Sequence, residues 1–410
     1  MRRVVVTGIG AVTPIGNNVP DFWEGLVNGK NGIAPITAFD TTDYKATLAA
    51  EVKDFEPTDY MEKGEARKLD RYTQFAMVSA AEAVADSGIE GKIEPERLGV
   101  YFASGIGGFH TFCEEDRKMV EKGPKRVSPH FIPKLILNLS AGNIAIKYNA
   151  QGPCISAVTA CATGTTNIGE AFRAIRHGYA DAVIAGGAEA AILDLGVAGF
   201  TNCMALCTGD DPDAASIPFD ARRSGFVMGE GAATLVLEEY EHAKARGAKI
   251  YAEICGYGST CDAYHVTAPS PDASGPARAI KDALTEADAV GCTNVYINAH
   301  GTSTPLNDKT ETIAIKKAFG EEDAKKVSIS STKSMTGHML GAAGAAEAIA
   351  AVLALKNGII PPTIGYKEPD PECDLDYTPN EAKKRDIDYA LSTSLGFGGH
   401  NACIIFKKAD

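Results

Sequence analysis

The 410-residue sequence lacks several patterns that mark particular classes of protein. Its ten cysteines form no Cys-x-x-Cys pair, which argues against a zinc site and against a thioredoxin-type motif. No stretch offers the ~18 uninterrupted apolar residues of a membrane span, since Glu347 interrupts the alanine-rich run 341–355. Thr7, Gly8 and Gly10 likewise cut short the first apolar run, unlike in a signal peptide. We therefore expect a cytoplasmic protein without membrane insertion and without a metal site.

Nucleotide and nucleic-acid binding are also disfavoured. The glycine-containing runs 8–13 and 229–234 miss the third glycine of the dinucleotide fingerprint, and no Gly-Lys-Ser or Gly-Lys-Thr phosphate loop occurs. The formal net charge is −13, from 40 basic and 53 acidic residues, so nucleic acid and anionic membranes are poor partners. An acidic protein partner would have to bind at a local basic patch.

What the sequence does contain is the pattern of a large α/β protein. Its 45% hydrophobic and 23% charged residues are typical of a soluble globular chain. Apolar strand-like runs alternate with amphipathic or alanine-rich helical runs, which favours buried sheets between helical layers. Strands are expected at 3–7, 98–103, 182–185, 234–237, 250–256, 295–298, 389–392 and 402–406. Helices are expected at 22–28, 68–87, 132–148, 162–177, 276–289, 309–319 and 342–357.

The first chemical motif is Thr-Ala-Cys-Ala-Thr-Gly around Cys161. It lies between a β-type run and a helix, which places the sulfur at or near a helix N-terminus. Unpaired backbone N–H groups and the helix dipole favour a thiolate there. The other nine cysteines have no such setting, and we expect them to be reduced and buried as small hydrophobic residues. Cys161 is therefore the candidate nucleophile.

Two further motifs place histidines beside glycine and small residues. His300 follows a strand and precedes a run of hydroxyl side chains, at a strand end where ligands commonly bind in α/β proteins. His338 ends the run Lys-Ser-Met-Thr-Gly-His just ahead of the alanine-rich helix. A cysteine nucleophile accompanied by two histidines indicates acyl transfer through a thioester. The glycine-rich turn 396–401 can offer a backbone N–H to an oxyanion, with Phe397 as a mobile gate.

With these motifs the chain resembles the β-ketoacyl-acyl carrier protein synthases of the thiolase superfamily, most closely the synthase II group. The likeness runs from Val-Val-Val-Thr-Gly-Ile-Gly near the start to Gly-Phe-Gly-Gly-His-Asn-Ala near the end. It implies a thiolase-like α/β fold of two similar halves stacked as αβαβα, usually in a homodimer. We expect the half with the cysteine to span 1–250 and the half with the histidines to span 251–410, the two together forming one compact unit.

The resemblance implies a two-stage reaction of type II fatty acid biosynthesis that needs no cofactor beyond the phosphopantetheine arm of acyl carrier protein. Cys161 would accept a fatty acyl group, and malonyl-carrier protein would lose CO2 and attack it as an enolate. The product is a 3-oxoacyl chain longer by two carbons. Backbone N–H groups of Cys161 and Phe397 would hold the tetrahedral oxyanion, and His300 and His338 the enolate oxygen. The resemblance does not decide which histidine assists the loss of CO2.

Other residues gain roles from the same resemblance. Lys333 would orient the histidines together with Glu347. Thr302 and Thr304 would hold the phosphopantetheine arm.

The resemblance also places an apolar tunnel for the acyl chain. Ile106 and Phe200 would line it, with Phe131 and Ile132 reaching in from the other subunit. Each buried methylene contributes about 0.8 kcal/mol, so tunnel length can select chain length. Ile106 and Phe397 would have to shift for long chains.

Two basic clusters are candidates for docking the acidic carrier protein. The first is a helix face with four-residue spacing that comprises Lys63, Arg67, Lys68 and Arg71. The second comprises Lys118, Lys122, Lys125 and Arg126. Met204 stands where some relatives carry an arginine, so the docking surface departs from the family pattern there.

Several other functions were weighed against this one. A thiolase or a synthase III uses one histidine differently or pairs it with asparagine. A noncatalytic chain-length partner of a polyketide synthase lacks the nucleophile, and a cysteine hydrolase needs open water access rather than a deep apolar lining. A ketosynthase of a polyketide pathway remains the alternative.

Overall fold

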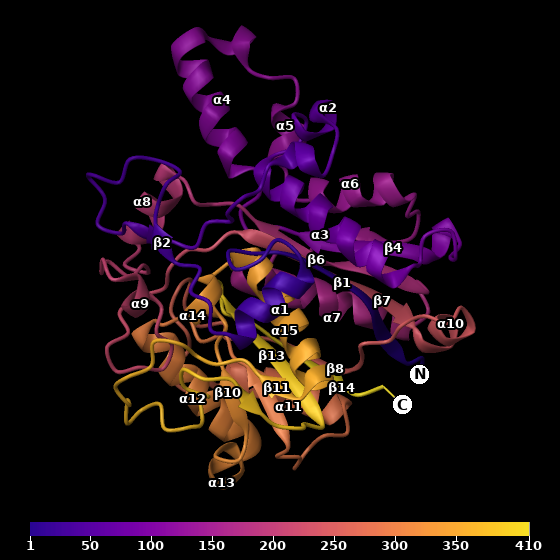
Figure 1. The fold of residues 1–410 in the computed structure, drawn as a ribbon, viewed down its shortest axis with the longest axis vertical. Coiled ribbons are helices and arrows are strands. Elements are labelled where there is room, and N and C mark those ends of the chain that lie inside the picture. The colour runs from indigo at the N-terminus through magenta and orange to yellow at the C-terminus, as the bar shows by residue number, and fades with distance from the viewer. Residues whose placement is uncertain (410) are drawn as a thin grey trace.

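The computed structural model describes residues 1–409, and its central feature is one large mixed sheet (Figure 1). Within those residues the sheet has ten strands. Across the sheet they run β10 (Ser328–Ser330), β9 (Val295–Asn298), β13 (Tyr389–Gly396), β14 (His400–Lys407), β8 (Ala252–Cys261), β1 (Val4–Val12), β7 (Gly231–Glu239), β6 (Ala182–Glu189), β4 (Leu98–Ala103) and β5 (Cys154–Ile155). Two further two-stranded sheets pair β2 (Ala34–Pro35) with β3 (Leu48–Ala49) and β11 (Ile359–Ile360) with β12 (Lys383–Lys384).

The strand order repeats in two halves that meet at the β1–β8 pair. In the N-terminal half, β1, β7 and β6 pair antiparallel, and β6, β4 and β5 pair parallel. In the C-terminal half, β8, β14 and β13 pair antiparallel, and β13, β9 and β10 pair parallel. The expectation of two similar halves is therefore confirmed, and most of each half occupies its own part of the molecule in Figure 1.

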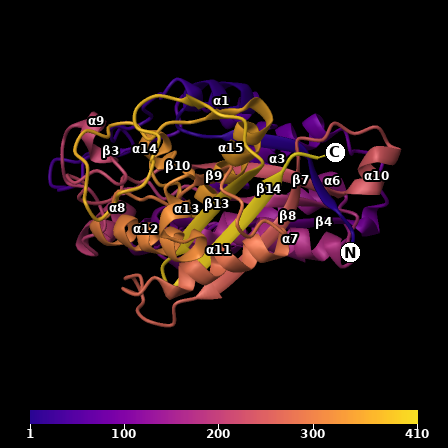
Figure 2. The same cartoon turned by 90° about the horizontal axis from the view of Figure 1, so that it is seen from below.

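Helices cover the outer faces of the two halves of the ten-stranded sheet and fill the space between these halves. The longer ones are α1 (Val19–Val27), α3 (Arg71–Ser87), α4 (Phe109–Lys122), α6 (Leu139–Tyr148), α7 (Thr163–Arg176), α8 (Asp194–Asn202), α11 (Ser274–Glu286), α12 (Pro305–Phe319) and α15 (Ala343–Asn357). Helix α3 packs outside β1 and β7, whereas α11 packs outside β8 and β14 beside α12 (Figure 2). Helices α7 and α15 contact each other and strands of both halves, so they form the middle of five αβαβα layers.

The middle helix α15 is apolar for a structural reason. Residues Leu340–Asn357 are long and apolar enough to cross a membrane, but 89% of them are buried inside the protein. All of Ala343–Leu355 is buried, including Glu347. A helix that is apolar on every side fits a position between the two halves of the large sheet.

The sequence located the central strands well and some helices poorly. Strands expected at 98–103 and 295–298 are found with those bounds. The helix expected at 132–148 is interrupted: α5 (Phe131–Leu135) ends where Ile136 adopts an extended conformation, and α6 follows. Helix α4 was not expected, because its sequence is mostly charged and polar. It projects from the body together with α5 in Figure 1.

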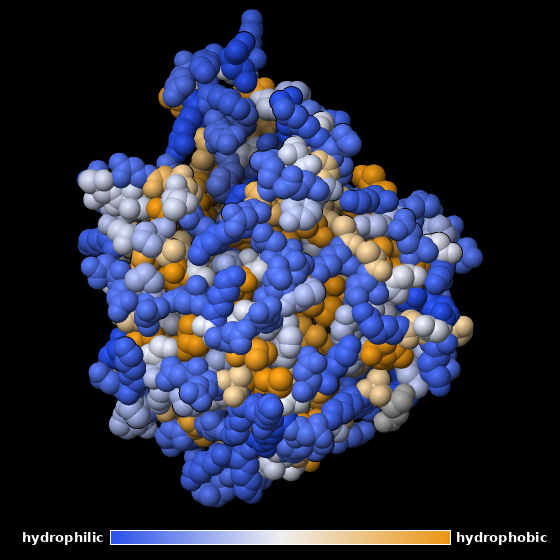
Figure 3. Space-filling model, viewed as in Figure 1, coloured by the Kyte–Doolittle hydropathy of each residue, from blue (hydrophilic) through white to orange (hydrophobic). Residues whose placement is uncertain are grey.

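The surface is mainly hydrophilic on the face shown in Figure 3, with apolar residues in small groups. All ten cysteines are free thiols, but only Cys113, Cys207, Cys255, Cys373 and Cys403 are buried. Cys154, Cys203 and Cys261 are exposed, which corrects the expectation that nine would be buried.

Candidate active site

Cys161 lies on a sharp elbow that leads into the middle helix α7. It occupies a 3-10 turn, Ala160–Ala162, directly before Thr163. Ala160 has φ of 50°, a left-handed conformation that costs a non-glycine residue free energy and marks functional turns. The turn after β13 packs behind this elbow so closely that a Cβ on Gly396 would lie 2.5 Å from the Thr159 carbonyl oxygen. Gly396 at the end of β13 therefore limits movement of the turn that contains Cys161.

The thiol of Cys161 is not ionised by its setting, which corrects the expectation of a thiolate. Burial raises the pKa of this thiol to about 11, and the negative charge of Glu189 adds to the rise. Lys333 and the backbone N–H groups of Phe397 and Cys161 act in the opposite direction, so these donors face the sulfur. The helix terminus offsets only part of the desolvation cost.

His300 and His338 lie together, as their motifs predicted. Their ring centroids are 5.2 Å apart and the rings stand at 86°. The backbone N–H of Leu340 donates to Nδ1 of His338 at 3.3 Å, so that nitrogen is an acceptor and Nε2 carries the proton of the neutral ring. Nδ1 of His300 is buried without a hydrogen-bond partner in residues 1–409.

Both histidines are neutral at physiological pH. Burial lowers the pKa of each well below its usual value, and the positive charge of Lys333 lowers it further. Lys333 is 1% exposed and pairs with the buried carboxylate of Glu347 on α15. This pair was expected next to the histidines, and the structure brings all four side chains into one buried cluster. Neutral imidazoles can donate a hydrogen bond to a developing oxyanion.

Glu311 holds the His300 segment in place, a contact that the sequence did not reveal. Its carboxylate accepts the backbone N–H groups of His300 and Gly301, both at 2.7 Å, and the hydroxyl of Thr393 at 2.7 Å. Burial raises the pKa of Glu311 to about 7. Glu311 lies on α12 without a glycine-flanked motif, so only the tertiary structure links it to the site.

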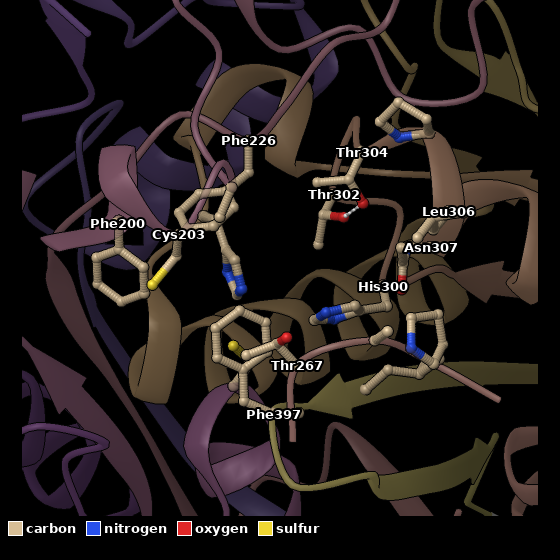
Figure 4. A pocket seen from close by; sticks show the side chains of 18 of the residues that line it. Phe200, Cys203, Phe226, Thr267, His300, Thr302, Thr304, Leu306, Asn307 and Phe397 are labelled. Carbon is tan, nitrogen blue, oxygen red and sulfur yellow. Dashed lines mark hydrogen bonds between the residues drawn. The ribbon is translucent and has the colours of Figure 1, made fainter. Parts of the chain in front are cut away.

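A cavity of about 390 Å³ joins these groups. Seven of the expected site residues line it: Cys161, Phe200, His300, Thr302, Thr304, His338 and Phe397. Figure 4 shows Phe200 and Phe226 on one side of the cavity and the two threonines, 2.9 Å apart at their hydroxyls, on another. Phe226 and Cys203, which also line the cavity, were not expected there.

Of the four residues expected to line the acyl tunnel, only Phe200 lines the cavity. Ile106 does not line the cavity, but it packs with Cys161 and Phe200 against one buried apolar cluster. Phe131 and Ile132 lie on α5 and do not line it either; Ile132 is 55% exposed. Their expected contact with the tunnel depends on a second subunit.

The first basic cluster is not one helix face, which corrects that expectation. Helix α2 (Lys63–Ala66) is short, and α3 begins only at Arg71 because the Asp70 carboxylate accepts the Tyr72 N–H as its N-cap. Arg71 is engaged with the buried carboxylate of Glu230 through bonds of 2.6 and 3.0 Å. Three members remain exposed: Lys63, Arg67 and Lys68.

The second cluster is partly exposed. Lys118 is half-buried and bonded to Glu115 at 2.5 Å, whereas Lys122, Lys125 and Arg126 are exposed. Among residues 1–409, no three His, Cys, Asp or Glu side chains are grouped to hold a metal ion.

The fold is α/β, and the cavity brings a cysteine and two neutral histidines together, an arrangement suited to acyl transfer. Family models for the N-terminal and C-terminal domains of beta-ketoacyl synthase match residues 1–243 and 251–367. The chain belongs to the beta-ketoacyl synthase family.

Curated relatives agree over the full length. The chain is 52% identical over 408 residues to 3-oxoacyl-[acyl-carrier-protein] synthase 2 of Staphylococcus aureus (strain COL), covering 99% of this chain and 98% of that protein. It is 50% identical over 409 residues to the protein of the same name from Synechocystis, with 99% and 98% covered.

Solved structures share the fold from end to end. A type II PKS ketosynthase in complex with its acyl-carrier protein is 37% identical with a TM-score of 0.92. A beta-ketoacyl synthase from Burkholderia phymatum is 36% identical with a TM-score of 0.93. Each match covers 100% of both chains.

Proposed function

We propose that this chain is a 3-oxoacyl-[acyl-carrier-protein] synthase that joins a Cys161-bound fatty acyl group to malonyl-acyl carrier protein with loss of CO2. One observation carries the proposal: a single cavity holds a cysteine at a helix N-terminus, two neutral histidines and a pair of threonine hydroxyls. The reaction needs a nucleophile, donors for two successive oxyanions and a polar grip on a flexible arm. This cavity supplies each of them.

In the first half-reaction, the sulfur of Cys161 attacks the thioester carbonyl of the incoming acyl chain. The backbone N–H groups of Cys161 and Phe397 stabilise the negative oxygen of the tetrahedral intermediate. The thiol loses its proton as the new C–S bond forms, because at a pKa of about 11 it is protonated at neutral pH. The carrier thiolate leaves and takes up a proton.

In the second half-reaction, the bond between the malonyl α-carbon and its carboxylate breaks, and the electron pair forms an enolate. Nε2–H of His338 donates to the enolate oxygen, and His300 donates alongside it. The carbanion attacks the acyl carbonyl on Cys161, and the C–S bond breaks to release the 3-oxoacyl product. CO2 departs, and the Cys161 thiolate takes up a proton from solvent to restore the thiol. The positive charge of Lys333 lowers the pKa of both histidines and so helps to keep their rings neutral. Each ring then acts as a neutral hydrogen-bond donor.

Fatty acid elongation fits better than polyketide synthesis. The 3-oxoacyl-[acyl-carrier-protein] synthases are 50–52% identical to this chain, whereas the type II PKS ketosynthase is 37% identical. The nucleophile is present, which argues against a noncatalytic partner. No step of the proposed reaction uses a metal or organic cofactor of the enzyme.

The carrier protein delivers both substrates on its phosphopantetheine arm. The neighbour solved with its acyl-carrier protein supports this partner. Lys63, Arg67 and Lys68 are the exposed residues from which we infer a docking patch, since an acidic carrier is attracted to local positive charge on an acidic enzyme.

We further propose a homodimer that forms through α4, α5, α6 and the edge strand β5. Large apolar side chains are exposed there: Phe112, Met119, Ile132, Ile136, Ile146 and Ile155. Exposed apolar patches and unpaired sheet edges are usually covered by a partner. This arrangement would bring Phe131 and Ile132 of one subunit toward the tunnel of the other.

The test separates the two half-reactions. Cys161→Ala should abolish acyl labelling from acyl-carrier protein and condensation together. His300→Ala and His338→Ala should still form the acyl-enzyme but lose CO2 release from malonyl-carrier protein. Acylation of another residue in Cys161→Ala, or normal CO2 release by both histidine variants, would overturn the proposal.

A further inference from the structure

Glu189 is a buried carboxylate that the proposed mechanism does not use. It is the last residue of β6, has no exposed surface, and lies between two segments of the site. One is the loop after β4 that contains Ile106, and the other is the 3-10 turn Leu340–Ala342 that precedes α15. A Cβ on Gly105 would lie 2.8 Å from Glu189 Oε2 and 3.5 Å from the Ala160 carbonyl oxygen, so Glu189 lies beside the turn that contains Cys161.

The carboxylate of Glu189 acts only as an acceptor in its four hydrogen bonds. The Ser104 hydroxyl donates at 2.5 Å, and the backbone N–H groups of Gly105, Ile106 and Gly341 donate at 2.9, 3.2 and 3.0 Å. Four donors match the ionised carboxylate, because a carboxylic acid would bring a proton of its own. Burial raises the pKa of Glu189, and these four bonds oppose that rise.

Ser104 extends the grip of Glu189 along the loop. While its hydroxyl donates to Glu189, its oxygen accepts the backbone N–H of Gly107 at 2.7 Å and that of Ile106 at 3.2 Å. The backbone N–H groups of Gly105 and Gly107 make hydrogen bonds of 2.9 and 2.7 Å, whereas both hydrogen bonds of the Ile106 N–H are 3.2 Å long. Among the backbone N–H groups of residues 105–107, that of Ile106 makes the longest hydrogen bonds and shares them between two acceptors.

Close packing limits movement on either side of Ile106. A Cβ on Gly105 would lie 2.8 Å from Glu189 Oε2, and one on Gly108 would lie 2.2 Å from the Lys134 carbonyl oxygen. Gly107 has φ of +85° and could not readily be another residue. The residues on either side of Ile106 are thus closely packed. Ile106 itself packs against the same apolar cluster as Cys161 and Phe200.

We propose that Glu189 is a positioning residue that, through Ser104, holds the Ile106 loop closed beside Cys161 and so sets the chain-length preference of acylation. The inference rests on the proposed function, since it takes Ile106 as the residue that must shift for long acyl chains. In this proposal the loop opens at the Ile106 N–H, whose two bonds of 3.2 Å are its longest to Glu189 and Ser104. Weakening their acceptors therefore favours long chains over short ones.

The experiment compares Glu189→Gln and Ser104→Ala with wild type. Acylation of Cys161 is measured with hexanoyl- and tetradecanoyl-carrier proteins. Both variants should raise the ratio of tetradecanoyl to hexanoyl acylation, by about threefold or more. Ser104→Ala removes one acceptor of the Ile106 N–H, and Glu189→Gln replaces one of the two acceptor oxygens with an NH2 group that faces donors. Unchanged ratios in both variants, with wild-type condensation intact, would overturn the role of Glu189 while leaving the proposed function standing.

A second readout does not depend on the reaction. Alkylation of Cys161 by iodoacetamide is followed against pH. Lys333 and Glu189 act on this thiol with opposite signs. Glu189→Gln removes the negative charge, so the thiol pKa should fall, whereas Ser104→Ala keeps the charge and should leave the profile in place. A shift of the same size in Ser104→Ala would show general loosening and contradict the proposal.

Glu238→Gln is the matched control. Glu238 is also a fully buried carboxylate of the same sheet, on β7, but its partners are His242 and Arg246. This variant should leave both the acylation ratio and the alkylation profile as in wild type. If Glu189→Gln does not fold, as judged by its melting curve, Ser104→Ala alone decides the chain-length claim.

Discussion

Two charges of opposite sign act on the thiol of Cys161. Lys333 and two backbone N–H groups favour the thiolate, whereas burial and Glu189 oppose it, and the opposing group is stronger because the pKa rises to about 11. The same N–H groups would act fully on the oxyanion that forms after attack. The free enzyme therefore keeps Cys161 as a thiol, which resists adventitious alkylation at neutral pH.

The pH dependence of alkylation tests this account of Cys161. With a pKa of about 11, only about one thiol in a thousand is ionised at pH 8, so alkylation by iodoacetamide should rise close to tenfold per pH unit up to about pH 10. Mass spectrometry of the Cys161 peptide separates it from the exposed cysteines. Half-maximal alkylation below pH 9 would contradict a raised pKa.

Lys333 and Glu347 provide a test of a buried ion pair. Lys333→Met leaves the Glu347 carboxylate buried without its partner, which should destabilise the protein by about 3–5 kcal/mol. Burial already raises the pKa of Glu347, so the loss of stability should grow as pH rises and be smallest in acid, where the carboxyl is neutral. Urea unfolding at pH 5 and pH 8 measures this.

The double variant Lys333→Met, Glu347→Leu serves as the control for that experiment. It should recover most of the stability, because apolar residues of similar size replace both charges. A double variant as unstable as the single one, at both pH values, would show that the pair is not the cause.

At the scale of elements, the contact between α7 and α15 fixes the site. Cys161 precedes α7 and His338 precedes α15, and each helix begins after a similar 3-10 turn. Ala160 and Leu340, the first residues of these turns, have left-handed φ of 50° and 47°. The two helices approach closely at glycines, since a Cβ on Gly344 would lie 2.8 Å from the Thr165 backbone nitrogen. The approach of the helices sets the distance between Cys161 and the histidines.

Gly344→Ala should therefore destabilise the protein although alanine favours helix. The added Cβ overpacks the α7–α15 contact at a cost of about 1–3 kcal/mol, which exceeds the helix-propensity gain of about 1 kcal/mol. Gly199→Ala in α8 is the matched control, because its Cβ would meet nothing within 4 Å. Chemical denaturation should show opposite signs for the two variants. A stabilised Gly344→Ala would refute the close contact.

The sequence predicts elements where local signals agree with burial. The strands at β4 and β9 are apolar runs and were located to the residue, and the glycine-flanked motifs placed Cys161, His300 and His338 together. Helix α4 was not predicted, because few of its residues are buried. The roles of Glu311 and Glu189 were not predicted, because each carboxylate finds its hydrogen-bond partners only when segments distant in the sequence come together. The raised thiol pKa escaped because desolvation depends on tertiary packing.

At the scale of the whole molecule, the site lies where the two halves meet. The N-terminal half contributes Cys161, and the C-terminal half contributes both histidines, Lys333 and Phe397. Neither half contains the complete set of groups. The apolar surface of α4, α5 and β5 lies on the N-terminal half and is the face that the proposed homodimer would cover.

Charge substitutions on this face test the proposed dimer. Sedimentation of the wild type should give twice the 43.0 kDa chain mass. Ile132→Glu combined with Ile155→Glu should shift the equilibrium toward monomer, because a buried interface would have to desolvate two carboxylates. Wild type that sediments as a monomer at micromolar concentration would contradict the proposal.

The most direct test of the central claim is mass spectrometry of the intact enzyme during one turnover. With octanoyl-carrier protein alone, the enzyme should gain one octanoyl group, located on Cys161. Addition of malonyl-carrier protein should return the enzyme to its original mass and yield 3-oxodecanoyl-carrier protein. An octanoyl group on any other residue, or an acyl-enzyme that malonyl-carrier protein does not discharge, would contradict the account.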